Sequence, residues 1–369
     1  MADDRLLVLA GDVMTGRGID QILPHRGDPH LEESYVVDAR SYVRLAERVN
    51  GAVPAPVDPA WPWGDVLETM DAAGPSWRVM NLETGVTTSQ EFAPGKAVHY
   101  RMNPANVACL EVAGVDVWTL ANNHVLDHGV PGLLETLETM RSHGLAHAGA
   151  GADSAEAWRP ATVGSGPGRL VVASVAHGSS GVPSPWTAAA DRPGVALLRD
   201  LSHQQADEVA ASLLRDSRPG DLCVVSVHWG SNWGYDVPSA QRRFAHRLVD
   251  AGVHVVHGHS SHHPRPVELY RGRLVLYGAG DLVNDYEGIS GYEEFRDDLR
   301  LLYLARLDAA TGGLRALRMV PFRSRRLRLE RAAHSDVNWL ARTLDAASHA
   351  FDVRVRATAD GELALRPGA

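Results

Sequence analysis

Cysteine is scarce in this chain of 369 residues, and long apolar runs are missing altogether. Cys109 and Cys223 are the only cysteines, and each lies in a short apolar stretch, which favours buried free thiols over a disulfide framework. No window approaches the length of a membrane helix, and the acidic N-terminus does not fit a secretory signal. We therefore expect a cytoplasmic protein without membrane insertion.

Positive charge is also in deficit. The formal net charge is -9 at pH 7, and 36 Lys and Arg residues are interspersed with 45 Asp and Glu residues. The pattern contains no basic stripe and no interleaving of basic and aromatic residues, which are the features that track a phosphate backbone. Nucleic acid is therefore not an expected partner, and we expect a peptide or small-molecule substrate instead. The oligomeric state is left open.

Short apolar segments alternate with amphipathic stretches, which indicates an α/β fold. Strands are predicted at 6–10, 78–80, 115–120, 223–227 and 253–256, and helices at 38–50, 64–73, 104–113, 131–143, 202–215 and 239–251. Further strands at 274–278, 299–307 and 314–321 are predicted to form a second sheet. We expect one domain over 1–330, with a C-terminal helix and hairpin over 331–369 packed on it.

Each of the first five predicted strands ends in an unusual polar motif. Open α/β sheets place their active sites at the carboxyl ends of their strands. The densest motif follows the fifth strand, where four histidines fall within seven residues, from His257 to His263. Imidazole is a common metal ligand and titrates near neutrality, so the cluster points to metal chemistry or proton transfer.

Neighbouring side chains of an extended segment face opposite ways, so His262 and His263 are not both expected to point into a site. We favour His262. His257 is left open between a site residue and a buried spacer.

The ordered motifs resemble those of the CapA family, named for capsule and poly-γ-glutamate synthesis. They lie at 11–17, 81–83, 121–129, 227–230, 257–268 and 276–281, and the resemblance runs from about Leu6 to about Tyr292. It implies the calcineurin-like metallophosphatase fold, a four-layer αββα sandwich of two mixed sheets with helices outside. It also implies a metal site built from the loops at strand ends.

The resemblance also assigns residues. It implies that Asp12 is the first-motif aspartate, that Glu83 stands near the bridging carboxylate, and that Asn123 supplies an amide oxygen. It further implies a catalytic imidazole at His124, metal ligands at His228 and His259, and the last motif's second histidine at His262, one residue late. We therefore predict metal ligation by Glu83, Asn123, His228 and His259, with Asp12, His124 and His262 handling protons.

One position departs from the family pattern. Where the resemblance implies a histidine two residues after Asp12, this chain has Met14, and hard divalent ions do not favour a thioether. We expect one tightly held divalent ion, with Ca, Mg, Mn and Zn all left open. Phosphoester hydrolysis through a two-metal clamp becomes less favoured as a result.

The remaining carboxylates and imidazoles suit general acid/base work, with a carboxylate orienting each histidine. Candidate pairs combine Asp12, Asp127 and Asp281 with His99, His124, His259 and His262, and both Asp127 and His99 are candidate catalytic residues. Two such pairs and a cation would serve Cα epimerisation of a peptide residue, and some proteins resembling this family are lasso-peptide epimerases.

An isomerase of this kind is our first hypothesis. The alternatives are a metallophosphoesterase and a non-catalytic accessory protein in poly-γ-glutamate or capsule assembly. Arg17 and Arg101 are candidate clamps for a carboxylate or a phosphate, and Trp229 is a candidate wall of a substrate groove. Ion pairing of the arginines and packing of the tryptophan are equally open.

Overall fold

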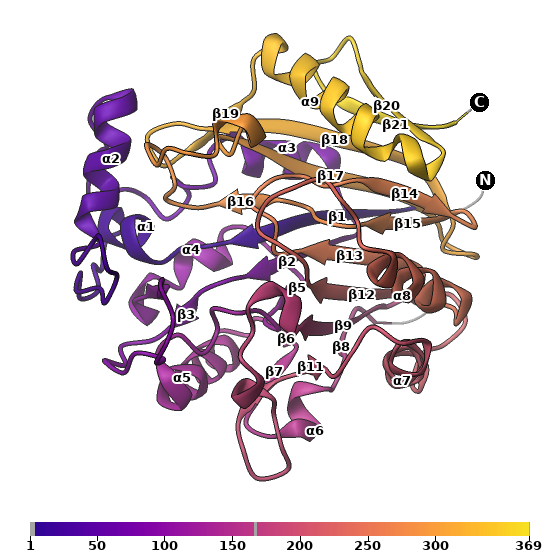
Figure 1. The fold of residues 1–369 in the computed structure, drawn as a ribbon, viewed down its shortest axis with the longest axis horizontal. Helices are drawn as coiled ribbons and strands as arrows, with labels where there is room; N and C mark the ends of the chain where they lie inside the picture. Colours follow the sequence, from indigo (N-terminus) through magenta and orange to yellow (C-terminus); the bar gives the residue numbers. More distant parts are fainter. Residues whose placement is uncertain (1–3, 166–167, 369) are drawn as a thin grey trace.

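The computed structural model describes residues 4–165 and 168–368 (Figure 1). Two β-sheets pack face to face, and helices cover their outer faces. This arrangement confirms the predicted four-layer αββα sandwich.

The larger sheet has the strand order β20-β21-β18-β17-β1-β2-β5-β6, and β16 and β19 join it beside β1 and β18. Strands β1, β2 and β5 are parallel, whereas β17 runs antiparallel to β1, so the sheet is mixed. The bounds are β1 Asp4–Val13, β2 Trp77–Leu82, β5 Val117–Thr119, β6 His147–Ala148, β16 Asp281–Val283, β17 Leu299–Asp308, β18 Leu314–Ser324, β19 Leu329–Arg331, β20 Val353–Ala357 and β21 Leu363–Pro367.

The second sheet has the order β11-β9-β12-β13-β15-β14, with β8 beside β9. Its bounds are β8 Ala161–Val163, β9 Leu170–His177, β11 Leu197–Leu198, β12 Leu222–His228, β13 Val255–His259, β14 Val267–Tyr270 and β15 Arg273–Leu276. Two short pairs lie outside both sheets, β3 Gly85–Val86 with β4 Arg101–Met102, and β7 Ala150–Gly151 with β10 Gly194–Val195.

The grouping of the later strands was predicted wrongly. Of the three segments assigned to one separate sheet, only the first, now β15, pairs with β13. The other two, β17 and β18, form a long hairpin whose first strand pairs with the free edge of β1. Apolar alternation predicts that a segment is a strand but carries no information on which edge it joins.

The helices are α1 Arg17–Ile22, α2 Arg40–Asn50, α3 Asp65–Ala73, α4 Ala108–Glu111, α5 Gly129–Ser142, α6 Ser154–Ala157, α7 His203–Leu214, α8 Ser239–Asp250 and α9 His334–Ser348. The helix predicted at 104–113 is divided into a 3₁₀ turn, Pro104–Asn106, and α4. The Asn103 side chain accepts a hydrogen bond from the Ala105 backbone amide and so caps the 3₁₀ turn, whereas the Asn106 side-chain amide donates to Asp20 Oδ1 and ties the turn to α1.

Side-chain alternation along the central strands builds the layers. In β1, Leu7 and Leu9 face the core between the sheets, whereas Val8 and Ala10 face the helices on the other side. The second sheet repeats the pattern, because Val224 of β12 points between the sheets while its neighbour Val225 packs under α7 and α8. Both sheets are therefore buried on both faces.

The C-terminal segment shares this core. Strand β21 pairs with β18, and Val337, Leu340 and Leu344 of α9 pack into the layer between the sheets. Cys109 and Cys223 are buried and free, as predicted. Over the described ranges, every helix falls short of the length and apolarity that crossing a bilayer requires.

Candidate metal centre and acid/base site

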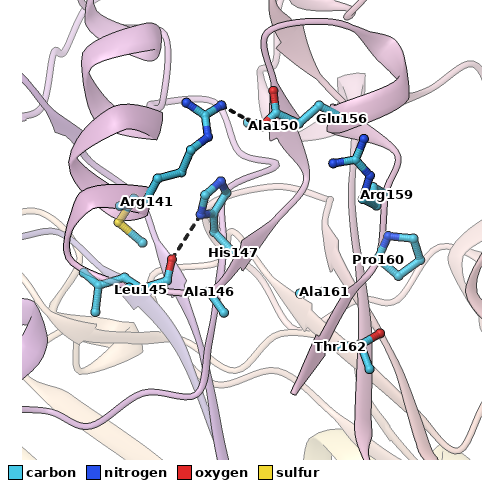
Figure 2. Close-up of a pocket in the computed structure, with 12 residues that line it drawn as sticks. Arg141, Leu145, Ala146, His147, Ala150, Glu156, Arg159, Pro160, Ala161 and Thr162 are labelled. Atoms are coloured by element: carbon cyan, nitrogen blue, oxygen red, sulfur yellow. Dashed lines mark hydrogen bonds and ion pairs between the residues drawn. The ribbon is translucent and has the colours of Figure 1, made fainter. Parts of the chain in front are cut away.

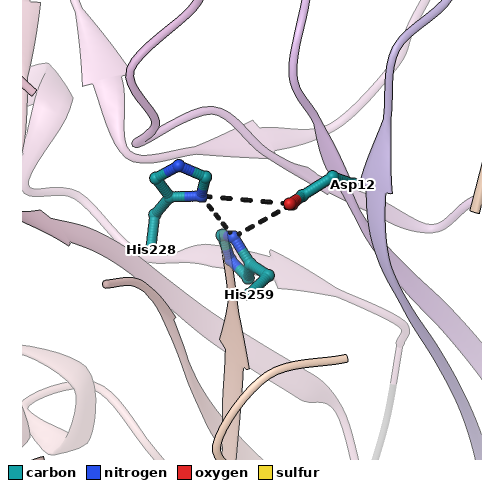
Figure 3. A group of neighbouring side chains, drawn as sticks. All are labelled: Asp12, His228 and His259. Atoms are coloured by element: carbon teal, nitrogen blue, oxygen red, sulfur yellow. Dashed lines mark hydrogen bonds and ion pairs between the residues drawn. The ribbon is translucent and has the colours of Figure 1, made fainter. Parts of the chain in front are cut away.

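The carboxyl ends of the parallel strands of both sheets meet at one place. In the larger sheet, Asp12 of β1 pairs in register with Asn81 of β2 and Asp281 of β16. In the second sheet, His228 of β12 lies directly opposite His259 of β13. The packing of the two sheets brings these ends together (Figure 3).

Backbone geometry beside Asp12 makes this approach close. A Cβ on Gly11 would overlap the carbonyl oxygen of Gly280, so the glycine lets the chain before Asp281 lie against β1. After His259 the chain turns at Ser260, whose φ is +105°, and the Ser260 amide donates to Asp12 Oδ2 at 3.0 Å. A non-glycine residue in this region is strained, which is common at functional sites.

Asp12, His228 and His259 form the centre of the site. Their ligand atoms lie within 4.8 Å of one another, and all three residues are buried. Asp12 Oδ1 is 3.4 Å from His259 Nδ1 and 4.0 Å from His228 Nδ1, and the two Nδ1 atoms are 2.8 Å apart. The Asn81 amide donates to Asp12 Oδ1 at 2.7 Å and fixes the carboxylate.

Burial alone would raise the pKa of Asp12, but the hydrogen bond to His259 and the charges of His228 and His259 hold it well below the ordinary value. Burial lowers the pKa of His228 well below its ordinary value. Asp12 therefore presents an anionic oxygen and His228 a neutral imidazole nitrogen, which are protonation states that bind divalent metals.

Glu83 and Asn123 extend this centre on the other side of His228. His228 Nε2 is 2.8 Å from Asn123 Oδ1 and 3.6 Å from Glu83 Oε1. Burial and the nearby charges of Asp12 and Asp281 raise the pKa of Glu83 well above its ordinary value. Among the described residues, Glu83 Oε2 is buried without a hydrogen-bond partner.

This donor set fits a divalent cation. Carboxylate, amide and imidazole donors together suit ions such as Zn²⁺ or Mn²⁺. A buried carboxylate oxygen without a partner is costly, and a bound cation would satisfy it. The predicted metal ligands Glu83, Asn123, His228 and His259 meet here together with Asp12, which was predicted to handle protons and which the geometry groups with two of the ligands.

A His/Asp pair adjoins the centre. His124 Nδ1 is 2.6 Å from Asp127 Oδ2, and the Tyr100 amide donates to the same oxygen at 2.7 Å. Burial alone would raise the pKa of Asp127, but the charges of His124 and Lys96 lower it to about 2. Because Asp127 is ionised, His124 donates from Nδ1, and its Nε2 stands 3.8 Å from Glu83 Oε1.

Burial lowers the pKa of His124 to about 4. The imidazole is therefore neutral near pH 7, with Nε2 able to accept a proton.

A second His/Asp pair lies nearby. His262 Nδ1 is 3.0 Å from Asp281 Oδ1, and burial would lower the pKa of His262, but the charge of Asp281 raises it. His262 also lines a cavity of about 160 Å³. Aromatic residues form much of its wall, among them Tyr100, Trp233, Tyr286 and Tyr292. A ligand in this cavity would lie against the His262 imidazole.

Other predicted residues are held elsewhere. His99 Nε2 lies 3.0 Å from the Ala93 carbonyl oxygen, and its ring packs against Phe92 and His128, so it pairs with none of the candidate aspartates. His257 contacts Ser226 Oγ at 3.1 Å and is buried behind His259. His263 accepts from the Gly234 amide at 3.0 Å and stacks on the Trp233 ring.

The three predicted substrate contacts all bind groups of the protein itself, and Arg17 also lines the cavity beside His262. Arg17 binds Asp285 and Glu33 in a buried network, with Nε 3.1 Å from Asp285 Oδ2. Arg101 donates to two backbone oxygens, Ser89 at 2.6 Å and Asp28 at 3.0 Å.

Trp229 is fully buried. Its indole donates to the Tyr277 carbonyl oxygen at 3.0 Å and stacks on the Tyr277 ring beneath α8. Arg17 thus forms the ion pairs, and Trp229 the packing, that were left open as alternatives, and a substrate contact by any of the three stays a prediction.

Sequence reasoning missed several residues of the site. Asn81 holds Asp12, Ser226 Oγ lies 2.8 Å from His259 Nε2, and Lys96 contacts the His124–Asp127 pair. Asn81 begins the strand-end motif 81–83 but was given no role of its own, and Ser226 has no distinguishing signal. Lys96 does, because it is the only lysine in the sequence.

A larger cavity lies apart from this site. It has a volume of about 430 Å³ and is bordered by α5, α6 and β8 (Figure 2). Its charged lining residues include Arg141, His147, Glu156 and Arg159. Arg141 and Glu156 pair at 2.6 Å, and none of the predicted site residues lines the cavity.

The side chains that meet at the strand ends come from separate motifs spread along most of the chain. Residues 6–286 match the family model described as bacterial capsule synthesis protein PGA_cap. This chain belongs to that family.

Two relatives illustrate the match. A Mycobacterium tuberculosis protein named "probable polyglutamine synthesis accessory protein" is 52% identical over 365 residues, which cover 98% of this chain and 96% of that protein. The PGA biosynthesis protein CapA of Bacillus subtilis is 28% identical over 225 residues, covering 60% of this chain and 56% of that protein.

Among solved structures, an NAD nucleotidase from Haemophilus influenzae superposes with a TM-score of 0.39 at 10% identity, over 90% of this chain and 49% of that chain. So distant a likeness bears on neither substrate nor activity.

Proposed function

We propose that this protein is a metal-dependent accessory protein in the synthesis of a glutamate- or glutamine-containing polymer. The observation that carries the proposal is the buried convergence of Asp12, His228 and His259 within a chain of the capsule synthesis family. The name of the M. tuberculosis relative supports the choice of polymer.

In this proposal Asp12, Glu83, Asn123, His228 and His259 hold a divalent cation. The bound ion would supply positive charge that polarises a carboxylate or amide oxygen of the polymer. His124 Nε2, oriented by Asp127, accepts a proton beside it, and His262, oriented by Asp281, stands next to the aromatic cavity. The substrate would therefore lie between the cavity and the metal ligands.

The test is complementation combined with metal analysis. A host strain lacking this gene is complemented with the wild type, with His228→Ala/His259→Ala, or with Arg40→Met as a surface control, and its cell-associated glutamyl polymer is measured. We expect the wild type and Arg40→Met to restore polymer and the double variant to fail. Full restoration by a folded, metal-free double variant would overturn the proposal.

Cα epimerisation is the second candidate, and one observation favours it. Two separate His/Asp pairs, His124–Asp127 and His262–Asp281, adjoin the site. Epimerisation would need two such pairs, one to remove the Cα proton and one to return a proton to the other face of the carbon. The names of the relatives do not point to this reaction. Incubation with candidate peptides in deuterated water tests it, and the absence of deuterium at any Cα would count against it.

A phosphoesterase is the remaining alternative. The same purified protein, loaded with Mn²⁺, should then hydrolyse p-nitrophenyl phosphate, and His124→Ala should abolish that turnover. Met14 weighs against it, because its thioether stands where the family pattern places a histidine ligand.

A further inference from the structure

Lys96 stands out from the rest of the basic residues. The chain has 36 Lys and Arg residues in total, and Lys96 is the only lysine among them. It lies in the loop between β3 and β4, and its side chain is 11% exposed. Since arginine fills every other basic position, a requirement for an ammonium group at this one position would account for the exception.

The Lys96 ammonium contacts three residues of the loop that follows β5, namely Asn123, His124 and Asp127. It donates to the backbone oxygen of Asn123 and pairs with Asp127 Oδ1 at 2.5 Å. It also lies 3.2 Å from His124 Nδ1. Above it, the Trp186 ring lies 5.1 Å away at its centroid, which shields the ammonium from solvent.

The two oxygens of the Asp127 carboxylate have different partners. Lys96 takes Oδ1, whereas His124 and the Tyr100 amide share Oδ2. The carboxylate is thereby fixed from both sides, and with it the plane of the His124 ring. The bond to the Asn123 backbone holds the same loop one residue earlier, where the Asn123 side chain reaches His228.

We infer that Lys96 is a positioning residue whose ammonium ties Asn123 to Asp127, so that the Asn123 amide oxygen is set toward the metal centre and His124 Nε2 toward Glu83. The inference rests on the metal centre proposed above. An ammonium suits this place because its donors radiate from one compact atom. A guanidinium is larger and planar, and its fork would have to displace either the backbone or the carboxylate.

The first test uses the wild-type protein. Labelling with lysine carrying ¹⁵N at Nζ gives one side-chain signal, because the chain has one lysine. We expect a slowly exchanging ammonium signal that shifts when Zn²⁺ is added. Binding of Zn²⁺ with no change in this signal would overturn the inference and leave the metal centre intact, whereas failure of Zn²⁺ to bind would overturn the proposed function.

The second test compares variants by metal competition against a chelator. Removal of groups that orient metal ligands typically costs ten- to a hundred-fold in affinity, so we expect a loss of about tenfold or more for Lys96→Met and Lys96→Arg. Arg40→Met, which removes an exposed ion pair, should bind like the wild type.

Chemical rescue separates positioning from mere support of the fold. Alkylation of the folded Lys96→Cys variant with 2-bromoethylamine rebuilds an ammonium of nearly the same reach, and Cys109 and Cys223 are buried from the reagent. We expect the alkylated protein to regain affinity that Lys96→Arg lacks. Equal affinity of Lys96→Arg and the wild type would contradict the requirement for an ammonium.

Discussion

Replacement of Arg17 by methionine should lower the free energy of unfolding of this protein strongly, and the loss should not depend on ligand binding. The Arg17 guanidinium binds Asp285 through Nε, 3.1 Å from Oδ2, and through Nη2, 2.5 Å from Oδ1. Its Nη1 lies 3.1 Å from Glu33 Oε1. The side chains of Arg17, Glu33 and Asp285 are 2%, 0% and 1% exposed. Methionine fills much of the volume but leaves two buried carboxylates without their cation.

The size of the effect follows from this burial. Removal of one partner from a buried ion pair costs about 3–5 kcal/mol, because the remaining charge is left uncompensated. A folded domain is stable by about 5–15 kcal/mol in total, so the loss is a large share. Arg17 Cζ also lies 3.7 Å from the Tyr42 ring centroid, and loss of this cation–π contact should lower the free energy of unfolding further.

The assay is urea unfolding of Arg17→Met beside Arg40→Met. Arg40 makes the same two-nitrogen fork with Asp38, but its side chain is 58% exposed, so we expect its variant to unfold like the wild type. The triple variant Arg17→Met/Glu33→Gln/Asp285→Asn should recover part of the lost stability. A stable Arg17→Met protein that fails to bind its ligand would refute this reasoning and restore Arg17 as a substrate clamp.

The remaining predictions concern acid, metal and packing. His254 accepts from the Cys223 amide, and burial lowers its pKa to about 4. Below about pH 6.5 the folded state therefore binds fewer protons than the unfolded state. The neutral His254 contributes about 1–3 kcal/mol to the free energy of unfolding above about pH 6.5, and this contribution is lost as the pH falls toward 4. His254→Asn should flatten acid denaturation over that window. Met14→His should raise the ions bound per chain from one toward two by elemental analysis, and unchanged stoichiometry would contradict the one-ion interpretation. Trp229→Leu should cost about 2–4 kcal/mol in unfolding free energy while metal affinity stays the same, whereas lost affinity in a stable variant would favour a substrate role.

The fold could be predicted well as far as local pattern reaches. The strands ending at Asp12, His228 and His259 were located because apolar runs end abruptly in polar motifs there. The pairing of β17 with β1 was not, since any strand of suitable alternation could join that edge. Pairing partners are set by packing over the whole chain, which a local pattern does not contain.

The site residues, too, could be predicted only where a local motif marks them. Ligands at strand ends, such as Asp12 and His259, are tied to motifs and meet in the structure. Arg17 and Trp229 were assigned substrate contacts from side-chain chemistry alone. The chemistry of a side chain does not show which groups lie beside it in the fold, and Arg17 pairs with Asp285, which is far away in the sequence. Lys96 carries a compositional signal, but its partners become visible only when the loop after β5 is folded against it.

The departure at Met14 and the late position of His262 have one structural explanation. The resemblance implies a histidine where Met14 stands and the last motif's second histidine one residue before His262, and in this chain Met14 and His262 both have partners within the protein. Met14 Sδ is 3.8 Å from the Tyr286 hydroxyl, and the Tyr286 ring packs edge-on against His262, which pairs with Asp281. A side chain bound to Asp281 is oriented for proton transfer, and a thioether beside a phenol offers little to a hard ion. If one ion binds, as we propose, the loss of a ligand at Met14 and the pairing of His262 with Asp281 would act together, and acid/base chemistry beside a single ion would be favoured over a two-metal attack on phosphate.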